Sequence, residues 1–562
     1  MSEQELKLHV PKAARAGVER ELMRGAVTRV RLRALYFDTS TRELARANVA
    51  LRLRQEGRQW IQTLKMPGDH VLARLEINHV RPGPILDLSV YAGTPAEPAL
   101  GALAGELGVC YETDIRRVLR KVRTRHGVVE VSFDTGCVRA GGLELPVSEV
   151  EFELMSGQLA AIFLLGARWL ASHSLVLDVR SKSERGDKLA SLAQTLLAPG
   201  SAAASNDVPG NASVGEADMI AARTAHIARF WEPRSGGPVL LDPKMTPEQA
   251  LATVTIECLD QIARNAGALA EIDTAGVCAV GTPEHVHQLR VGIRRLRSAW
   301  SLFNGIADLP PLALREAIKV HFSSLGGTRD DDVLRETLMP VLRAAGQPPL
   351  DLQKTDYVDH TDQVSGGRAF QGWLVDMLAW TLNAQPVVPT PSTPAPDLGA
   401  SPSADEAQSG SAADTGLIEP QIIPMEGLTV PKPVSLRAVL TRKLRKWHRQ
   451  VVRDGLRFEA LDIETRHALR KRAKRLRYGL QFAETLLPTN RLRNYRKQLS
   501  AVQNELGEMN DLAVGLTRFE GLRDTQPSAW FACGWIHARL DALVHETSAT
   551  FRQLARTTPF WR

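Results

Sequence analysis

The chain opens with an alternation of polar and apolar side chains, Glu3-Gln4-Glu5-Leu6-Lys7-Leu8-His9-Val10. Because successive side chains of a β-strand point to opposite faces, this pattern predicts a strand with Glu3, Glu5 and Lys7 on one face. The two carboxylates repel each other, by about 4 kcal/mol at ~4 Å and an effective dielectric near 20. A divalent metal with oxygen ligands would relieve this repulsion, and Lys7 could hold an anion that the metal carries. Taken alone, the stretch also fits a solvated strand face.

Charged and apolar residues alternate in the strand-like segments that follow, which are 31–39, 50–54, 63–65, 74–76, 123–125, 130–134 and 149–154. Acidic residues are concentrated in the first and last strands, and basic residues in those between. A one-sided sheet explains alternation but not so many like charges on one face. We therefore predict an antiparallel β-barrel with a wet lumen, in which carboxylates hold metal and Arg and Lys bind phosphates. The helices expected to cover it are near 11–23, 97–108, 157–172 and 187–197.

From about residue 243 the pattern becomes helical and contains an internal repeat. His287, Arg290, Arg294 and Arg297 recur 180 residues later as His467, Arg470, Lys474 and Arg477. At about 100° per residue, these positions fall within roughly 80° of one another, opposite a stripe of leucines. Each copy is predicted to be an amphipathic helix. Leu325-Gly326 and Leu506-Gly507 form a second matching pair, so we predict an all-α domain of two repeated helical bundles.

The basic stripes carry more charge than an ordinary solvated face. Residues 437–477 hold fifteen Lys or Arg residues against four Asp or Glu. Such crowding is self-repulsive, which favours a polyanionic ligand. Nucleic acid is the competing ligand, but the stripes lack the interleaved aromatic residues on which single strands stack. No second His or Cys lies at i, i+4 spacing from His287 or His467, so a metal site there is not favoured.

Length and composition add the domain boundaries. A chain of 562 residues is too long for one core. We predict a barrel domain at 1–195, a flexible linker at 196–242 that tethers the domains loosely, and a helical domain at 243–562. Residues 383–432 hold nine prolines among many Ser, Ala and Gly, which predicts a disordered insertion.

Other global features exclude some classes of protein. The five cysteines are scattered, which argues against a disulfide framework or a zinc ribbon. No apolar run approaches the roughly 18 residues of a membrane helix, and no signal-peptide pattern opens the chain. These features predict a cytoplasmic protein that does not contact membranes. The net charge of +7 agrees with a polyanionic partner.

Several motifs of the first 195 residues together resemble the CYTH, or triphosphate tunnel metalloenzyme, family. They are Glu3-x-Glu5-x-Lys7, Tyr36-Phe37-Asp38-Thr39, Leu51-Arg52-Leu53-Arg54, Thr63-Leu64-Lys65, Glu149-Val150-Glu151-Phe152-Glu153-Leu154 and Ser181-Lys182. The resemblance implies that Mg²⁺ or Mn²⁺ is held by Glu3, Glu5, Glu151 and Glu153, assisted by Asp134. It implies triphosphate binding by Lys7, Arg52, Arg54, Lys65 and Lys182, together with Arg123 and Arg125. Where the family often has two tyrosines, this chain has Tyr36-Phe37.

The chemistry that this resemblance implies is phosphoryl transfer to water, which needs positioning and charge stabilisation more than covalent catalysis. The implied catalytic set is Glu3, Glu5, Lys7, Glu151 and Glu153. Either a second metal or one of the Glu residues would activate the water. Inorganic triphosphate is favoured over thiamine triphosphate or ATP, because no signature of a pocket for an organic base is present. The alternatives are an adenylate cyclase and a non-catalytic protein of polyphosphate granules.

The helical half, residues 243–382 with 433–562, resembles the CHAD domain, the conserved histidine α-helical module. The resemblance rests on the two His-x-x-Arg helices and the two Leu-Gly segments described above. It implies that inorganic polyphosphate binds to the two basic stripes and that the protein associates with polyphosphate granules. Nucleic acid is not the expected partner.

Overall fold

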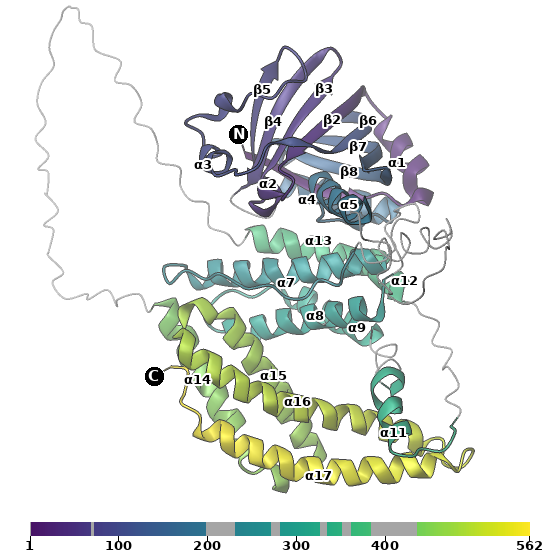
Figure 1. Cartoon of the computed structure of the whole chain (residues 1–562), viewed down its shortest axis with the longest axis vertical. Coiled ribbons are helices and arrows are strands. Elements are labelled where there is room, and N and C mark those ends of the chain that lie inside the picture. The colour runs from purple at the N-terminus through teal and green to yellow at the C-terminus, as the bar shows by residue number, and fades with distance from the viewer. Residues whose placement is uncertain are drawn as a thin grey trace, which may run out of the picture.

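The computed structural model describes residues 2–68, 72–197, 231–270, 281–325, 334–350, 361–383 and 435–561. Its N-terminal part, residues 2–197, contains a closed antiparallel β-barrel (Figure 1). Within the described residues, eight strands pair in the order β5-β4-β3-β2-β6-β7-β8-β1, and β1 also pairs with β5 to close the ring. The strands are β1 (Ser2–His9), β2 (Thr28–Asp38), β3 (Ala50–Glu56), β4 (Gln59–Pro67), β5 (Ala73–Arg81), β6 (Gly108–Thr124), β7 (Gly127–Ala140), β8 (Leu143–Gly157) and the short β9 (Val176–Leu177), which pairs with β1. The predicted barrel is confirmed.

The strand register brings the acidic residues of the first and last strands together. Glu5 on β1 lies opposite Glu153 on β8, and Lys7 lies opposite Glu151. On the other side of β8, Asp134 of β7 lies opposite Glu149. Side chains of directly opposed antiparallel residues are close neighbours on one face of the sheet. The register therefore gathers carboxylates from three adjacent strands on the inner wall.

Helices cover parts of the barrel exterior, and one predicted span is wrong. The helical segments of this part are η1 (Lys12–Ala14), α1 (Arg15–Leu22), α2 (Glu43–Arg46), η2 (Leu88–Tyr91), α3 (Glu97–Gly101), α4 (Ala160–His173) and α5 (Lys182–Leu197). The helix expected near 97–108 ends at Gly101, and β6 already begins at Gly108. The leucines between them, Leu103 and Leu107, pack against a small barrel core without helical structure.

The helical part, residues 231–561, consists of two groups of helices (Figure 1). The first group is α7 (Pro247–Leu269), α8 (Pro283–Phe303), α9 (Leu312–Ser324), α12 (Thr361–Gly366) and α13 (Arg368–Asn383). The second group is α14 (Leu436–Gly455), η4 (Phe458–Ala460), α15 (Ile463–Phe482), η5 (Glu484–Leu486), α16 (Thr489–Glu520) and α17 (Ala529–Arg556), with η3 (Leu334–Leu338) and α11 (Met339–Ala344) packed against its far end. The repeated sequences lie on α8 and α15, which contact each other.

The two parts are packed together, contrary to the predicted loose tether. Helix α4 lies between the barrel and α13, and apolar residues of the barrel exterior, α4 and the helical part form one continuous core. Residues 231–242, expected to be linker, lie against the helical part, where Val239 and Leu241 are buried. A flexible-linker composition at 196–215 did not predict this interface, because the contacts are made by segments on either side.

Three other predictions concern segments outside the described residues. These are most of the linker (198–230), nearly all of the 383–432 insertion, and Gly326 of the first Leu-Gly pair. In the part of the chain that the structure describes, no helix is both long and apolar enough to span a membrane.

Candidate active site

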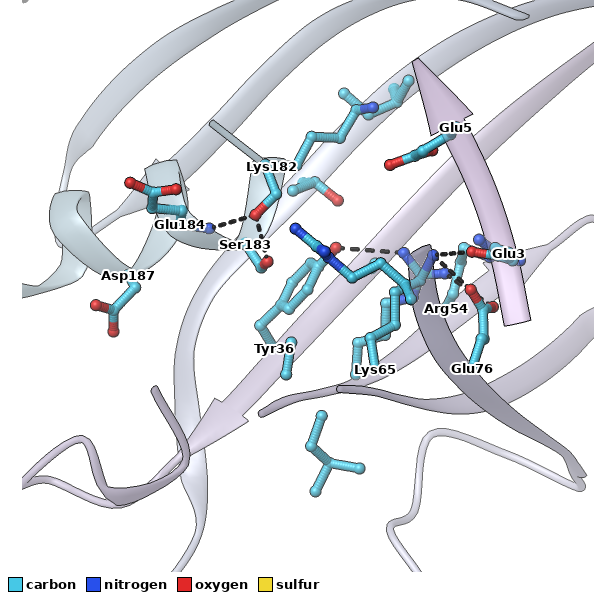
Figure 2. A pocket seen from close by; sticks show the side chains of 18 of the residues that line it. Glu3, Glu5, Tyr36, Arg54, Lys65, Glu76, Lys182, Ser183, Glu184 and Asp187 are labelled. Carbon is cyan, nitrogen blue, oxygen red and sulfur yellow. Dashed lines mark hydrogen bonds and ion pairs between the residues drawn. The ribbon is translucent and has the colours of Figure 1, made fainter. Parts of the chain in front are cut away.

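The barrel encloses a cavity of about 780 Å³ that is lined by both acidic and basic side chains. Inward-facing residues from β1 to β8 and from the first turn of α5 form its wall. Figure 2 shows Glu3 and Glu5 on one side of the cavity, Glu184 and Asp187 on the other, and Tyr36 and Lys65 between them. The predicted charged lumen is therefore present.

A cluster of carboxylates lies on the wall formed by β7 and β8. Asp134, Glu149 and Glu151 each offer an oxygen within 4.8 Å of the others. The Lys182 ammonium contacts all three and lies 2.7 Å from an oxygen of Asp134 and of Glu151. Arg117 holds Asp134 through two hydrogen bonds of 2.7 Å. Although burial disfavours its charged form, Lys182 and Arg117 keep the pKa of Asp134 below its usual range.

A second group of carboxylates surrounds β1. The Lys65 ammonium lies 2.8 Å from Glu3 and also contacts Glu76. Burial and the neighbouring Glu76 carboxylate raise the pKa of Glu3 to about 7. Burial and the nearby carboxylates of Glu5 and Glu130 raise the pKa of Glu153 to about 7. Both shifts therefore arise first from burial and second from neighbouring carboxylates.

The carboxylates of the β7–β8 wall suit a hard divalent cation. Of the predicted ligands, Asp134 and Glu151 lie together with Glu149, whereas Glu3, Glu5 and Glu153 line the same cavity but belong to no such close group among the described residues. Oxygen-only ligands suit Mg²⁺, Mn²⁺ or Ca²⁺ rather than Zn²⁺, which takes nitrogen and sulfur readily. A bound cation would also favour the charged forms of Glu3 and Glu153, whose pKa values are raised by burial and by neighbouring carboxylates. Glu149 joins the same cluster, although its nearest partners are Lys182 and Arg185.

Five of the predicted phosphate-binding residues line the cavity, and two do not. Lys7, Arg52, Arg54, Lys65 and Lys182 are wall residues. Arg123 and Arg125 are absent from the wall. They lie at the end of the β6–β7 hairpin, where the Arg125 Nε donates to His126 at 2.9 Å. The barrel lumen ends before this hairpin, so strand alternation alone could not exclude them.

Arg117 of β6 lines the cavity, whereas the sequence had predicted this role for Arg123 and Arg125. It shares the inner face of β6 with Thr113 and Ile115. The adjacent Arg116 obscured the alternation, so the sequence pattern did not reveal which arginine points inward. The sequence pattern placed Glu76 on a strand with charged residues. Its contact with Glu3 arises because β5 pairs with β1 and closes the barrel.

The repeated helices bring basic residues of both copies together. Arg294 of α8 and Arg470, Lys474 and Arg477 of α15 are electrostatically coupled, and we call these four residues the basic cluster. Burial and these neighbouring arginines lower the pKa of Lys474 to about 7. Among the described residues, the buried Nε atoms of the three arginines have no hydrogen-bond partner. Within the described residues, Asp511 is the carboxylate that acts on both Arg470 and Lys474.

The remaining stripe residues lie near the basic cluster but have other surroundings. Arg290 donates to the Leu325 carbonyl, and its guanidinium lies 4.8 Å from the centre of the Phe322 ring. Arg297 lies 5.9 Å from the same ring. His287 is half-buried and His467 is exposed. Burial and neighbouring cations lower the pKa of His467.

The barrel, its acidic wall and its basic lining residues form a charged tunnel in the N-terminal part, and a helical part with a basic cluster follows it. Comparison with known protein families identifies a family for each part. Residues 1–186 match the CYTH domain and residues 256–520 match the CHAD domain. The chain therefore contains a CYTH domain followed by a CHAD domain, as the motifs predicted.

Individual relatives match single parts of the chain. An inorganic triphosphatase from Haemophilus influenzae is 32% identical over 163 residues, which are 28% of this chain and 45% of that protein. The chain thus matches less than half the length of this relative. The CHAD domain of Ricinus communis is 24% identical and covers 58% of this chain and 97% of its own, with a TM-score of 0.42. A putative adenylate cyclase from Bacillus halodurans is 22% identical and covers 33% of this chain and 98% of its own, with a TM-score of 0.25.

Proposed function

We propose that the barrel cavity catalyses the metal-dependent hydrolysis of inorganic triphosphate and that the helical part binds inorganic polyphosphate. The observation that carries the first half is the presence of clustered carboxylates and five predicted cations in one cavity of about 780 Å³. A compact phosphate chain needs both, since a divalent cation bridges its oxygens to carboxylates while Arg and Lys bind the rest. The triphosphatase activity named for the Haemophilus influenzae relative agrees with this proposal.

The chain's own residues would position the phosphates and stabilise developing charge. Arg52, Arg54 and Lys65 reach the cavity from β3 and β4, and Lys182 reaches it from α5. Fixed cations of this kind stabilise the transferring phosphoryl group without reorganising during the reaction. Mg²⁺ or Mn²⁺ would be held by Glu3, Glu5, Asp134, Glu151 and Glu153, and it would neutralise phosphate charge and lower the pKa of attacking water.

The aromatic residues of the cavity favour a ligand without a base. Of the three aromatic residues that line the wall, Phe37 packs against a small barrel core, and the rings of Tyr36 and Tyr111 stack on each other with centroids 4.5 Å apart. Both side chains are buried, and the Tyr36 hydroxyl accepts a hydrogen bond from Arg52 at 3.4 Å. A nucleobase would have to separate this pair in order to stack. This arrangement supports inorganic triphosphate over ATP.

Polyphosphate binding by the helical part rests on the basic cluster. Its three arginines have buried Nε atoms that find no hydrogen-bond partner in the part of the chain that the structure describes, and its lysine has a pKa of about 7. A polyanion would supply hydrogen-bond acceptors to the arginines and restore the charge of Lys474. Association with polyphosphate granules in the cytoplasm follows from this proposal and stays a prediction.

Phosphate release from inorganic triphosphate tests the catalytic proposal. We expect release with Mg²⁺ or Mn²⁺, none with excess EDTA, and recovery when the metal is restored. ATP and thiamine triphosphate serve as competing substrates, with cyclic AMP measured in the ATP reaction. Tight triphosphate binding without any release would indicate a non-catalytic binder, and cyclic AMP formation would indicate a cyclase. Either result would overturn the proposal.

A further inference from the structure

The helical part reaches the segment that carries Lys182, the cation at the centre of the carboxylate cluster. The amide of Leu177 donates to Gln371 of α13 at 2.8 Å. Three residues further on, the Arg180 guanidinium lies 3.9 Å from the centre of the Trp231 ring. Arg264 of α7 then contacts Glu184 in the first turn of α5. The end of the tunnel wall that α5 forms is therefore built against the helical part.

Arg264 is a cavity-lining residue that comes from the helical part rather than from the barrel. It holds the Glu184 carboxylate in a two-point contact, in which Nη1 contacts Oε1 and Nη2 lies 3.1 Å from Oε2. Its Nε donates to Asp260 at 2.7 Å, which fixes the guanidinium on α7. Planar two-point pairs of this kind are among the stronger charge-assisted contacts.

The two carboxylates on this side of the cavity each have an arginine partner. Glu184 is paired with Arg264, and Asp187 is paired with Arg42 of the barrel (Figure 2 shows the two carboxylates). They lie on the opposite side from Glu3 and Glu5. A carboxylate on this side would repel an incoming polyanion unless its charge were neutralised.

Building on the proposed function, we propose that Arg264, which the helical part contributes to the cavity wall, neutralises Glu184 there and so permits triphosphate to bind. The tunnel is then complete only when the helical part is docked on the barrel. Glu184 provides the charge-dependent contact between the two parts, and the helical part becomes a component of the substrate-binding site.

The test is a set of variants of the full chain: Arg264→Ala, Glu184→Gln and the double variant. The Kd of triphosphate is measured by calorimetry in EDTA, and KM and kcat are measured with metal. For Arg264→Ala we expect Kd and KM to rise about tenfold, as expected for one unit charge about 12 Å from a unit charge of the ligand at an effective dielectric near 20. The increase should shrink in high salt. The kcat should change less, because the ion-pair partners of Arg264 are Glu184 and Asp260 rather than the predicted metal ligands.

The double variant separates charge neutralisation from a structural role. Adding Glu184→Gln removes the carboxylate that Arg264→Ala leaves without its arginine partner, so Kd and KM should return to within about twofold of wild type. Arg368→Ala is the matched control, because Arg368 bonds Ser174 across the same interface at 2.7 Å and does not line the cavity. It should leave Kd and KM unchanged. No rescue in the double variant, or an equal loss in the control, would overturn the proposal. A wild-type chain that binds triphosphate without hydrolysing it would refute only the proposed catalysis.

Discussion

Lys65 and Lys182 of the tunnel differ from Lys474 of the basic cluster in how their charge is compensated. In the tunnel, Lys65 is paired with Glu3 and Glu76, and Lys182 with three carboxylates. In the basic cluster, burial and neighbouring arginines lower the pKa of Lys474 to about 7. A compensated cation keeps its charge in the absence of ligand, whereas a crowded one loses part of it. We infer that substrate phosphates replace carboxylates as the partners of Lys65 and Lys182. The basic cluster, in contrast, needs a bound anion to balance its charge.

Loss of a tunnel carboxylate should have the largest effect. Glu151→Gln removes a predicted metal ligand that also contacts Lys182 at 2.7 Å. We expect kcat/KM for triphosphate to fall by more than the about 10–100-fold typical of losing an outer-shell partner of a metal. Polyphosphate affinity should be unchanged.

Asp114→Asn provides the control for that variant. Asp114 lies on β6 outside the cavity wall, and it contacts Arg31 at 2.8 Å on the barrel exterior. Initial rates at saturating and limiting Mg²⁺ are compared for both variants. Near-normal rates for Glu151→Gln at limiting Mg²⁺ would contradict its assignment as a ligand.

Neutralising the basic cluster should give the opposite pattern. Arg470→Gln, Lys474→Gln and Arg477→Gln together remove three predicted phosphate contacts. The slope of log affinity for long-chain polyphosphate against log salt should flatten by about 2, using −0.7 per contact as for single-stranded nucleic acid. The KM for triphosphate should stay within about twofold, and the melting temperature should not fall, because like charges are removed.

Arg52→Ala is the reciprocal variant, since Arg52 lines the tunnel. It should raise the KM for triphosphate and leave the polyphosphate salt slope unchanged. If RNA of equal charge displaces polyphosphate from the wild-type chain, the helical part is a nucleic-acid binder. If one variant impairs both ligands, the two regions are not independent.

The smallest expected effect is a pH dependence of polyphosphate binding. Because the pKa of Lys474 is about 7, its protonated fraction rises as pH falls from 8 to 6. A polyanion favours the protonated form, so affinity should increase over that range by at most about tenfold. Conversely, between pH 7 and 10 the unfolded lysine binds a proton that the folded one does not, so this group makes the ligand-free protein more stable as pH rises.

The control for this dependence is Lys474→Arg, which keeps a cation that does not titrate in the range. It should bind polyphosphate with a flatter pH profile. The stripe histidines are the competing explanation, and His467→Asn should leave the profile intact because the pKa of His467 is already lowered. Loss of the profile in His467→Asn would assign the effect to that histidine.

Local patterns in the sequence were sufficient for the fold of each part. Alternation with period two at Glu3, Glu5 and Lys7 indicated a strand with a charged inner face, and the repeated basic stripes indicated two helices. The resemblance to the CYTH family, rather than a local pattern, implied the five cations that line the cavity. Both patterns are visible locally, because a side chain's face depends on its position along a single element.

Which residues of different elements meet in the cavity was decided by the tertiary structure alone. Arg117 rather than Arg123 faces the lumen, because the barrel interior ends before the β6–β7 hairpin. Glu76 meets Glu3 only because β5 closes on β1. Arg264 lines the tunnel only because α7 docks beside α5, which no pattern within α7 records. Residues distant in sequence share a site through strand closure and domain packing, and these depend on the whole core rather than on any one segment.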